Sequence, residues 1–150
     1  MKGTLHSYAS IFNLGHAAVA DIFDGPVLIQ EKVDGSQFSF GRIDGEFVCR
    51  SKGKNQTPPV TDKMFDLAVK HTSTLDLHPS WTYRGEFLAK PKHNALAYER
   101  VPAGHVVIFD IDAGLEDYLP YPDMEAECKR IGLEPVPLLL PWSRWEGGWE

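Results

Sequence analysis

The segment QFSFGRIDGEFVC (residues 37–49) decides the fold class of this chain. Polar and apolar residues alternate over 37–40, which is the pattern of a strand with one buried face. Asp44-Gly45 then separates two runs with strand character, and this dipeptide accepts the positive φ angles that a tight hairpin turn requires. We therefore predict an antiparallel hairpin that turns at Asp44-Gly45.

The neighbouring segments extend this hairpin into a larger sheet. Residues 27–33 are predicted to form a strand that stops at Asp34-Gly35, so that the first strands make an antiparallel meander. Three later segments rich in apolar, aromatic or β-branched residues are also expected to be strands, namely 81–88, 105–111 and 136–140. The second of these is mostly apolar, which predicts a central place in the sheet.

Three helices are predicted around the sheet. Residues 17–23 are expected to form a short helix. Apolar residues at helical spacing predict a helix over 62–72, with Asp62 placed to help it start. A third helix is expected over 123–131, with Gly132 just past its end. This order of elements predicts an α+β fold, mainly antiparallel sheet with a few packing helices, and not a βαβ repeat.

Length and composition limit the class of protein. The chain has 150 residues, of which 43% are hydrophobic and 24% charged, so we expect one soluble globular domain over residues 1–150. No apolar run is long enough to span a bilayer, and the N-terminus carries no hydrophobic signal segment. The two cysteines, Cys49 and Cys128, are too far apart for a zinc motif or a disulfide framework. These features predict a cytoplasmic protein.

The net charge of −6 argues against a protein that coats nucleic acid through its overall field. A local basic groove remains compatible with that charge. Two small basic clusters occur, and taken alone each is best explained as solvated loop charge. The first comprises Arg50, Lys52 and Lys54, and the second comprises Lys90, Lys92 and His93.

The run Glu31-Lys32-Val33-Asp34-Gly35 places a lysine near the end of a predicted strand, just before a turn. A neutral lysine is a good nucleophile, and burial or neighbouring cations favour the neutral form. A strand end would fix the direction of Lys32, and Gly35 would let a nucleotide approach the backbone closely. Short motifs of this kind often occur by chance, so the pattern needs support from the rest of the chain.

That support comes from five further motifs, which follow one another in a defined order. They are Ser7-Tyr8-Ala9-Ser10-Ile11, Arg50-Ser51-Lys52-Gly53, Arg84-Gly85-Glu86-Phe87, Val107-Ile108-Phe109-Asp110-Ile111 and Pro135-Val136-Pro137-Leu138-Leu139. With these motifs the chain resembles the covalent nucleotidyltransferases, a superfamily of ATP-dependent DNA ligases, RNA ligases and mRNA capping enzymes. The resemblance is greatest to the second class of phage RNA ligases and to the RNA-editing ligases, and it covers nearly the whole chain.

The resemblance implies a nucleotidyltransferase core of the ATP-grasp-like ligase type, with Lys32 as the catalytic residue. Lys32 would attack the α-phosphate of ATP and release pyrophosphate, with Mg²⁺ bridging the phosphates. The lysyl–AMP would pass AMP to a 5′-phosphate end, which a 3′-hydroxyl then attacks. The implied partners are nucleic-acid ends, RNA more than DNA, and no membrane.

The same resemblance implies a set of nucleotide-binding residues. Glu86 would accept hydrogen bonds from the ribose hydroxyls, and Phe109 would offer a flat apolar face to adenine. Lys52, rather than Arg50, would offset phosphate charge, and Gln37 would hold a phosphate or a nucleic-acid end. The full set is Glu31, Gln37, Arg50, Lys52, Glu86 and Phe109.

Two departures from the family pattern bear on activity. The ligases more often carry arginine where this chain has Lys52, and lysine lacks the bidentate fork of arginine. Later motifs of the types E-G-x-V and K-x-K are expected to be absent. Glu146-Gly147 resembles the first of them only superficially. We therefore expect a core that lacks its C-terminal strands. Such a core would hold a nucleotide but seal ends poorly, unless a second polypeptide supplies these motifs.

Three alternative interpretations stay open. The run Phe109-Asp110-Ile111-Asp112 resembles the D-x-D signature of haloacid-dehalogenase-type phosphatases, in which two carboxylates hold magnesium and attack phosphate. A truncated or split ligase domain would bind a nucleotide or a partner without catalysis. A DNA ligase or a capping guanylyltransferase would share the core, although these enzymes usually add an OB-fold domain.

Overall fold

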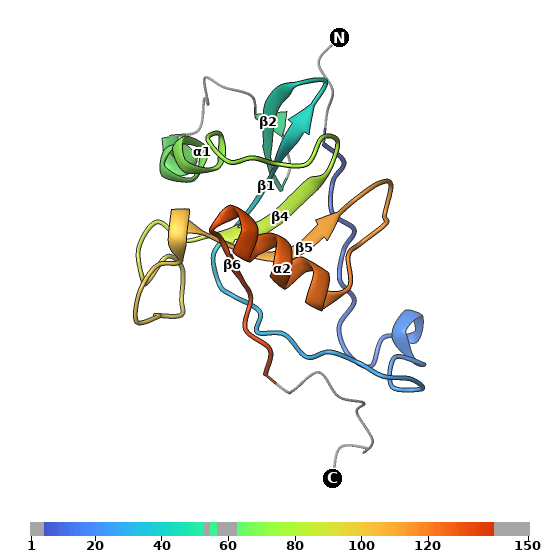
Figure 1. Cartoon of the computed structure of the whole chain (residues 1–150). Helices are drawn as coiled ribbons and strands as arrows, with labels where there is room; N and C mark the ends of the chain where they lie inside the picture. The colour runs from blue at the N-terminus through green and yellow to red at the C-terminus, as the bar shows by residue number, and fades with distance from the viewer. Residues whose placement is uncertain (1–4, 53–54, 57–62, 140–150) are drawn as a thin grey trace. The chain divides into compact units, whose positions relative to one another are not determined.

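The computed structural model describes residues 5–52, 55–56 and 63–139 of the chain. The chain divides into two compact units. The larger unit comprises Met1–Ser7 and Val33–Pro135, and the smaller unit comprises Tyr8–Lys32 and Val136–Glu150. The sheet and both α-helices lie in the larger unit (Figure 1). The fold is therefore α+β, as predicted.

The predicted hairpin is present. β1 (Ser36–Ile43) pairs antiparallel with β2 (Glu46–Ser51), in a register that sets Ile43 opposite Glu46. Asp44 and Gly45 form the turn with φ angles of 52° and 80°. These angles are the left-handed backbone geometry that a two-residue hairpin turn requires. The structure therefore confirms both the predicted hairpin and the positive φ angles expected at its turn.

Within the described residues, six strands form one sheet in the order β3-β2-β1-β4-β5-β6. β4 (Thr82–Phe87) lies between β1 and β5 (Val106–Asp112) and is antiparallel to both. The short strands β3 (Asn55–Gln56) and β6 (Glu134–Pro135) lie at the two edges, and β6 is parallel to β5. The sheet is therefore mainly antiparallel. The apolar strand β5 has a neighbour on each side, although β1 and β4 hold the central positions.

Large aromatic side chains cover one face of the sheet. Cross-strand pairing puts Phe38 and Phe40 of β1 on the same face as Tyr83 and Phe87 of β4. Phe38 stacks on Phe65 with ring centroids 5.3 Å apart, and Phe40 stacks on Tyr83 at the same separation of 5.3 Å. All five rings are buried. Burial of one such side chain contributes roughly 1.5–3 kcal/mol, so this face forms the core of the larger unit.

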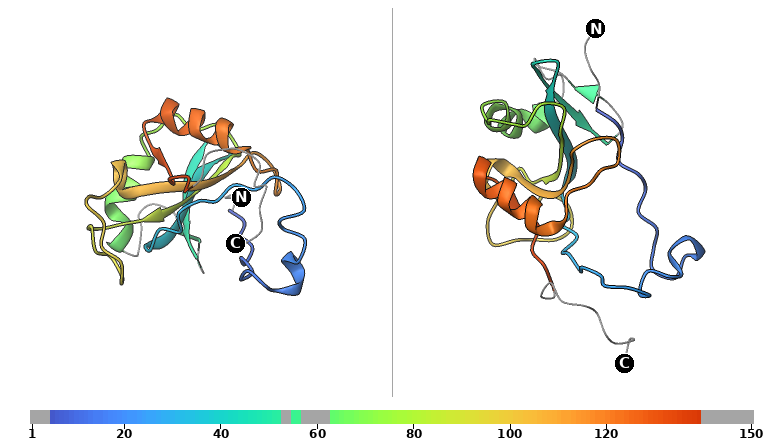
Figure 2. Two further views of the ribbon diagram at one scale, coloured as in Figure 1. Left: turned by 90° about the horizontal axis from the view of Figure 1, so that it is seen from below. Right: turned by 45° about the vertical axis from the view of Figure 1, so that its right-hand side comes forward.

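Helices pack against this aromatic face. η2 (Lys63–Phe65) contributes Phe65 to the core and leads into α1 (Asp66–Thr72). α2 (Tyr121–Ile131) runs across the sheet beside β5 (Figure 2). It ends at Gly132, whose φ of 77° is the left-handed cap that the sequence predicted. Among the described residues, no helix has the length and apolar character needed to cross a membrane.

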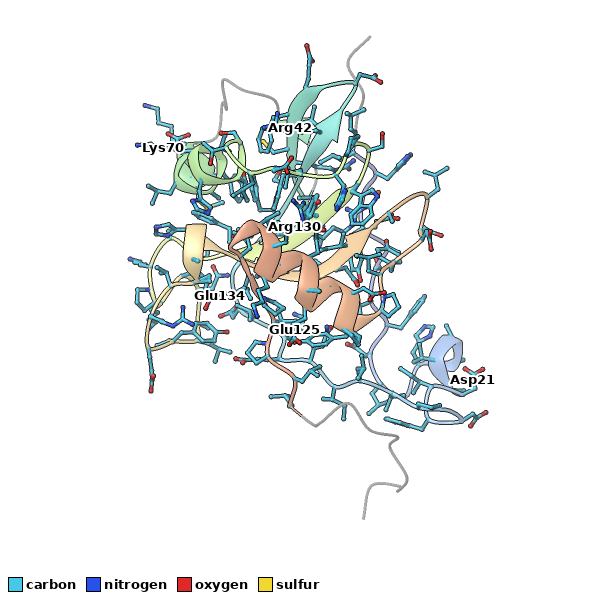
Figure 3. All side chains as sticks on the ribbon, viewed as in Figure 1. Asp21, Arg42, Lys70, Glu125, Arg130 and Glu134 are labelled. Atoms are coloured by element: carbon cyan, nitrogen blue, oxygen red, sulfur yellow. The ribbon has the colours of Figure 1, made fainter. Side chains whose placement is uncertain are left out.

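The buried carboxylate of Glu127 connects α2 to the segment before β4. Glu127 is only 7% exposed; its Oε1 accepts a hydrogen bond of 2.8 Å from Arg130 Nε, and its Oε2 lies 3.0 Å from His78 Nε2. Arg130, labelled in Figure 3, also donates from Nη2 to the carbonyl oxygen of Asp76 at 2.6 Å. A buried carboxylate is tolerated when it is paired and hydrogen bonded, and both conditions hold here.

The first and last predicted strands are wrong as strands of the sheet. Residues 27–32 and 136–139 belong to the smaller unit, where an isolated bridge joins Gln30 to Leu138. Two backbone hydrogen bonds flank the bridge, Glu31 N–H to Pro137 O at 2.9 Å and Leu139 N–H to Ile29 O at 2.8 Å. Apolar runs carry strand propensity but do not specify their partner, and this pairing is long-range in the sequence. The last residue of the predicted strand, Leu140, lies outside the described residues.

Two predicted helices differ from their expected form. The N-terminal one is a single 3₁₀ turn, η1 (Ala17–Val19), with no buried residue. A short segment that buries nothing lacks the tertiary packing that stabilises most protein helices. The second begins as η2 and becomes α-helical only at Asp66. Its predicted starting residue, Asp62, lies outside the described residues.

Both cysteines are buried free thiols, Cys49 in β2 and Cys128 in α2. Burial raises the pKa of each thiol to about 12, so the reactive thiolate is scarce in the folded chain. We expect neither thiol to react with dithionitrobenzoate at mildly alkaline pH until denaturant unfolds the chain, when both react. Absorbance of the released thionitrobenzoate measures this. A thiol that reacts in native buffer as fast as free cysteine would contradict its packing.

Candidate functional site

The face of the sheet opposite the aromatic core carries polar side chains. Side chains alternate between the two faces of a strand, so residues between the buried rings point to this side. We call it the polar face, and its members are Gln37, Ser39, Arg50, Arg84, Glu86 and Asp110. Three predicted nucleotide-binding residues, Gln37, Arg50 and Glu86, therefore share one face of one sheet.

Gln37 and Glu86 are direct cross-strand partners in the pairing of β1 with β4. Residues in such positions have Cβ atoms about 4.5–5.5 Å apart. Both residues are half-buried, so a carboxylate and an amide lie side by side near the start of β1. A carboxylate only accepts hydrogen bonds, whereas an amide both accepts and donates. Together they can hold the hydroxyl groups of a ribose and an oxygen of a phosphate.

Phe109 lies at an irregularity in β5. The register of β4 with β5 shifts between Arg84 and Gly85, and Phe109 is the extra residue of the resulting β-bulge. Val107 is the cross-strand partner of Glu86, so alternation from Val107 places Phe109 on the polar face. Phe109 is half-buried there and does not join the aromatic core. Phe109 and Glu86 therefore share the polar face, and the extra residue brings Asp110 to that face as well.

Arg84 is 1% exposed and is the buried cation of the polar face. Its cross-strand partners are Ser39 and Asp110. Its Nη1 donates a hydrogen bond of 2.9 Å to the carbonyl oxygen of His6. Burial raises the pKa of the nearby Tyr118, and the Arg84 charge opposes this rise. Arg84 was not among the predicted site residues, and its only signal in the sequence was its place in the motif of residues 84–87.

Arg50 holds the N-terminal segment on the polar face. Its Nη1 donates a hydrogen bond of 2.7 Å to the carbonyl oxygen of Leu5. Leu5 is 2% exposed, and its side chain lies beside Gly41 of β1. Lys52, in contrast, is exposed just after the end of β2. The guanidinium of Arg50 is thus engaged by the chain itself, whereas the Lys52 side chain is open to solvent.

Gly35 stands immediately before β1, and the structure gives a new reason for its identity. A Cβ atom at this position would lie 2.3 Å from the carbonyl oxygen of Phe87 in β4. Gly35 does not adopt a positive φ, so its conformation alone does not require glycine. The close approach of the two backbones requires it. The sequence interpretation assigned this glycine to the approach of a nucleotide, whereas its immediate neighbour is the sheet.

Asp112, which the phosphatase interpretation requires, is engaged in a turn. It is 4% exposed, and its carboxylate accepts hydrogen bonds of 2.9–3.1 Å from three backbone N–H groups. The donors are Gly114, Glu116 and Asp117. A carboxylate that accepts three backbone hydrogen bonds has little capacity left for a metal ion or a phosphate. The geometry therefore disfavours a D-x-D phosphatase.

Lys32 and Glu31 are described within the smaller unit. The Glu31 N–H donates to the carbonyl oxygen of Pro137 at 2.9 Å, and the Lys32 side chain is exposed. The peptide bond after Lys32 leads to Val33, where the larger unit resumes. The roles of Lys32 and Glu31 therefore rest on their sequence motif. The predicted residues that the larger unit brings to one face are Gln37, Arg50, Glu86 and Phe109.

The described residues do not form a metal site. In the part of the chain that the structure describes, no group of three or more His, Cys, Asp or Glu side chains could hold a metal ion. Mg²⁺ was predicted only as an ion that bridges the phosphates of ATP, and these residues do not test that prediction.

A family model described as RNA ligase matches residues 25–145. No curated protein matches the chain. The matched region contains the Lys32 motif, every strand of the sheet and both α-helices. Because the match spans most of the chain and all of the candidate site residues, the chain belongs to the RNA ligase family.

Proposed function

We propose that this chain is an ATP-dependent RNA ligase nucleotidyltransferase in which Lys32 forms a covalent lysyl–AMP intermediate. Membership of the RNA ligase family supports the ligase class. The observation that carries the nucleotide assignment is the cross-strand pair of Gln37 and Glu86, with Phe109 on the same face of the sheet. A carboxylate, an amide and an aromatic ring on one face suit a ribose, a phosphate and a purine.

The proposed reaction has three transfers at phosphorus. The neutral amine of Lys32 attacks the α-phosphorus of MgATP, the bond to the bridging oxygen breaks, and pyrophosphate leaves while the amine releases a proton to solvent. An oxygen of an RNA 5′-phosphate then attacks the same phosphorus. The P–N bond breaks, and Lys32 takes up a proton again. Finally a 3′-hydroxyl attacks the activated 5′-phosphate, and AMP leaves.

The polar face would bind the nucleotide and leave the nucleophilic step to Lys32. Glu86 would accept hydrogen bonds from the ribose hydroxyls, and Phe109 would cover the adenine ring. The Gln37 amide would donate to a phosphate oxygen. Lys52 would offset phosphate charge as a point charge, without the two parallel hydrogen bonds that an arginine can form.

Intact-mass spectrometry after incubation with MgATP tests the proposal. The expected result is a mass gain of one AMP that acid removes and alkali does not, as for a P–N bond. A gain of one GMP from GTP instead would identify a capping-type transferase. Nucleotide binding without a mass gain would leave a binding domain without adenylyl transfer. A chain that neither binds ATP nor gains mass would exclude the proposed function.

Replacing Glu86 with alanine is expected to slow lysyl–AMP formation at subsaturating ATP by roughly tenfold to a hundredfold. A hydrogen bond to a charged group contributes about 1.5–3 kcal/mol, and this variant removes the ribose acceptor. The measurement is label transfer from radioactive ATP to the protein, resolved on a denaturing gel. Glu46→Ala is the matched control, because Glu46 is exposed and begins β2 at the hairpin turn. Equal rates for Glu86→Ala and Glu46→Ala would remove Glu86 from the site.

A further inference from the structure

A loop between β4 and β5 returns to residues 34–36, which we call the turn after Lys32. β4 ends at Phe87, and residues 89–98 then form hydrogen bonds to residues 34–36. Both segments belong to the larger unit. We call residues 89–98 the clamp loop. None of its residues was among those predicted to form the site.

Asp34 is the main attachment point of the clamp loop. Its Oδ2 accepts hydrogen bonds from the backbone N–H groups of Ala95 and Leu96, at 2.8 Å and 2.9 Å. Its own N–H donates to the hydroxyl of Tyr98 at 2.7 Å. Hydrogen bonds to a carboxylate are stronger than those between neutral groups. The clamp loop therefore fixes both the side chain and the backbone of Asp34.

The two residues after Asp34 are held as well. The Asn94 Nδ2 donates to the carbonyl oxygen of Gly35 at 2.8 Å. The His93 Nε2 lies 2.9 Å from Ser36 Oγ, and the His93 Nδ1 accepts from the Ala89 N–H at 3.2 Å. A ring nitrogen that accepts a hydrogen bond carries no proton, so the neutral ring has its proton on Nε2 and donates it to Ser36. Three successive residues are thus held by one loop.

We infer that the clamp loop positions Lys32 for adenylyl transfer, with Asn94 and Tyr98 as positioning residues. This inference rests on the proposed function of Lys32. Only Val33 separates Lys32 from Asp34, so a turn fixed from Asp34 onward leaves few free backbone dihedrals after the lysine. Nucleophilic attack requires reacting atoms about 3–3.5 Å apart, and a misplacement of about 1 Å can lower the rate roughly a hundredfold.

The clamp loop and the nucleotide contacts should affect different kinetic constants. The clamp loop acts on the turn after the nucleophile, whereas the proposed ribose and adenine contacts come from Glu86 and Phe109. Loss of clamp contacts should therefore lower the maximal rate more than the apparent affinity for ATP. A merely structural role would instead lower the melting temperature and change both kinetic constants.

The test is the double variant Asn94→Ala with Tyr98→Phe, which removes two side-chain contacts to the turn. Leu96→Ala is the matched control, because the Leu96 side chain is 55% exposed and the hydrogen bond from Leu96 to Asp34 comes from its backbone N–H, which alanine keeps. We expect the double variant to lower the maximal rate of lysyl–AMP formation by roughly tenfold to a hundredfold. The half-saturating ATP concentration should change by less than about threefold. Leu96→Ala should match the wild type in both.

Amide hydrogen exchange at Asp34 reports on the clamp without any ligase activity. We expect faster exchange in the double variant, since the Asp34 N–H loses its acceptor on Tyr98, and no change in Leu96→Ala. Unchanged exchange in the double variant would overturn the clamp. Faster exchange with an unchanged maximal rate, or a rate loss explained by a lower melting temperature, would overturn the positioning role and leave the Lys32 chemistry intact. If wild type and Leu96→Ala both form no lysyl–AMP, the proposed function fails and the positioning role fails with it.

Discussion

Replacement of Lys32 with alanine is expected to abolish lysyl–AMP formation, with a loss of at least about a thousandfold. Lys32 is the only proposed nucleophile, and alanine has no group that could attack the α-phosphorus. The measurement is intact mass after incubation with MgATP, supported by label transfer from radioactive ATP. Lys70→Ala is a suitable control, because Lys70 is also an exposed lysine and lies in α1, outside the clamp loop and the proposed nucleotide site.

A second readout separates loss of the nucleophile from loss of the fold. RNA that already carries a 5′-adenylyl group enters the reaction after the step that Lys32 performs. The Lys32→Ala variant should therefore seal such RNA at a rate close to that of the wild type, whatever that rate is. A Lys32→Ala protein that still gains AMP would place the nucleophile elsewhere in the chain.

Replacement of Gly35 with alanine is expected to destabilise the chain by about 1–3 kcal/mol, the usual cost of forcing an added methyl group into a packed site. The new Cβ would lie 2.3 Å from the Phe87 carbonyl oxygen, which belongs to the backbone of β4 and cannot rotate away. The start of β1 would have to move away from β4. Because Gly35 also accepts the hydrogen bond from Asn94, the turn after Lys32 should shift and adenylylation should slow.

Chemical denaturation measures this change in the free energy of unfolding. Gly25→Ala is the matched control, because a Cβ at Gly25 would meet no atom within 4 Å and its φ is not positive. We expect Gly25→Ala to unfold at nearly the same denaturant concentration as the wild type. If Gly35→Ala unfolds at that concentration too, the close approach of β1 and β4 described here is wrong.

Local signals in the sequence were sufficient to predict much of the secondary structure of the larger unit. The dipeptide Asp44-Gly45 predicted its turn correctly because the backbone angles of a hairpin are a local requirement. Gly132 predicted the end of α2 for the same reason. The strands β4 and β5 were predicted because runs of apolar, β-branched and aromatic residues favour strands. In each case the determining residues are neighbours in the chain.

Predictions that depended on distant partners failed or stayed incomplete. Residues 27–33 have strand composition, yet their described pairing is a single bridge from Gln30 to Leu138 in the smaller unit. The helix expected over 17–23 is only a 3₁₀ turn, because nothing in it is buried. Propensity describes what a segment tolerates, and long-range packing decides what it becomes.

For the candidate site, the sequence supplied the residue types and the structure supplied their neighbours. Motif order named Lys32, Glu86 and Phe109, but it could not show that Gln37 is the cross-strand partner of Glu86. It could not foresee the β-bulge at Phe109 either, since a bulge is a property of the register between two strands. The hydrogen bond from Arg50 to the Leu5 carbonyl oxygen could not be predicted from the sequence either.

By itself, the sequence determined the α+β class, the hairpin at Asp44-Gly45 and the likeness to RNA ligases. These follow from local backbone geometry, from period-two burial and from the order of short motifs. Only the tertiary structure decided which polar residues share the face of the sheet, why Gly35 must be glycine, and that residues 89–98 hold the turn after Lys32. Those facts depend on contacts between segments far apart in the chain, and no local pattern encodes such a contact.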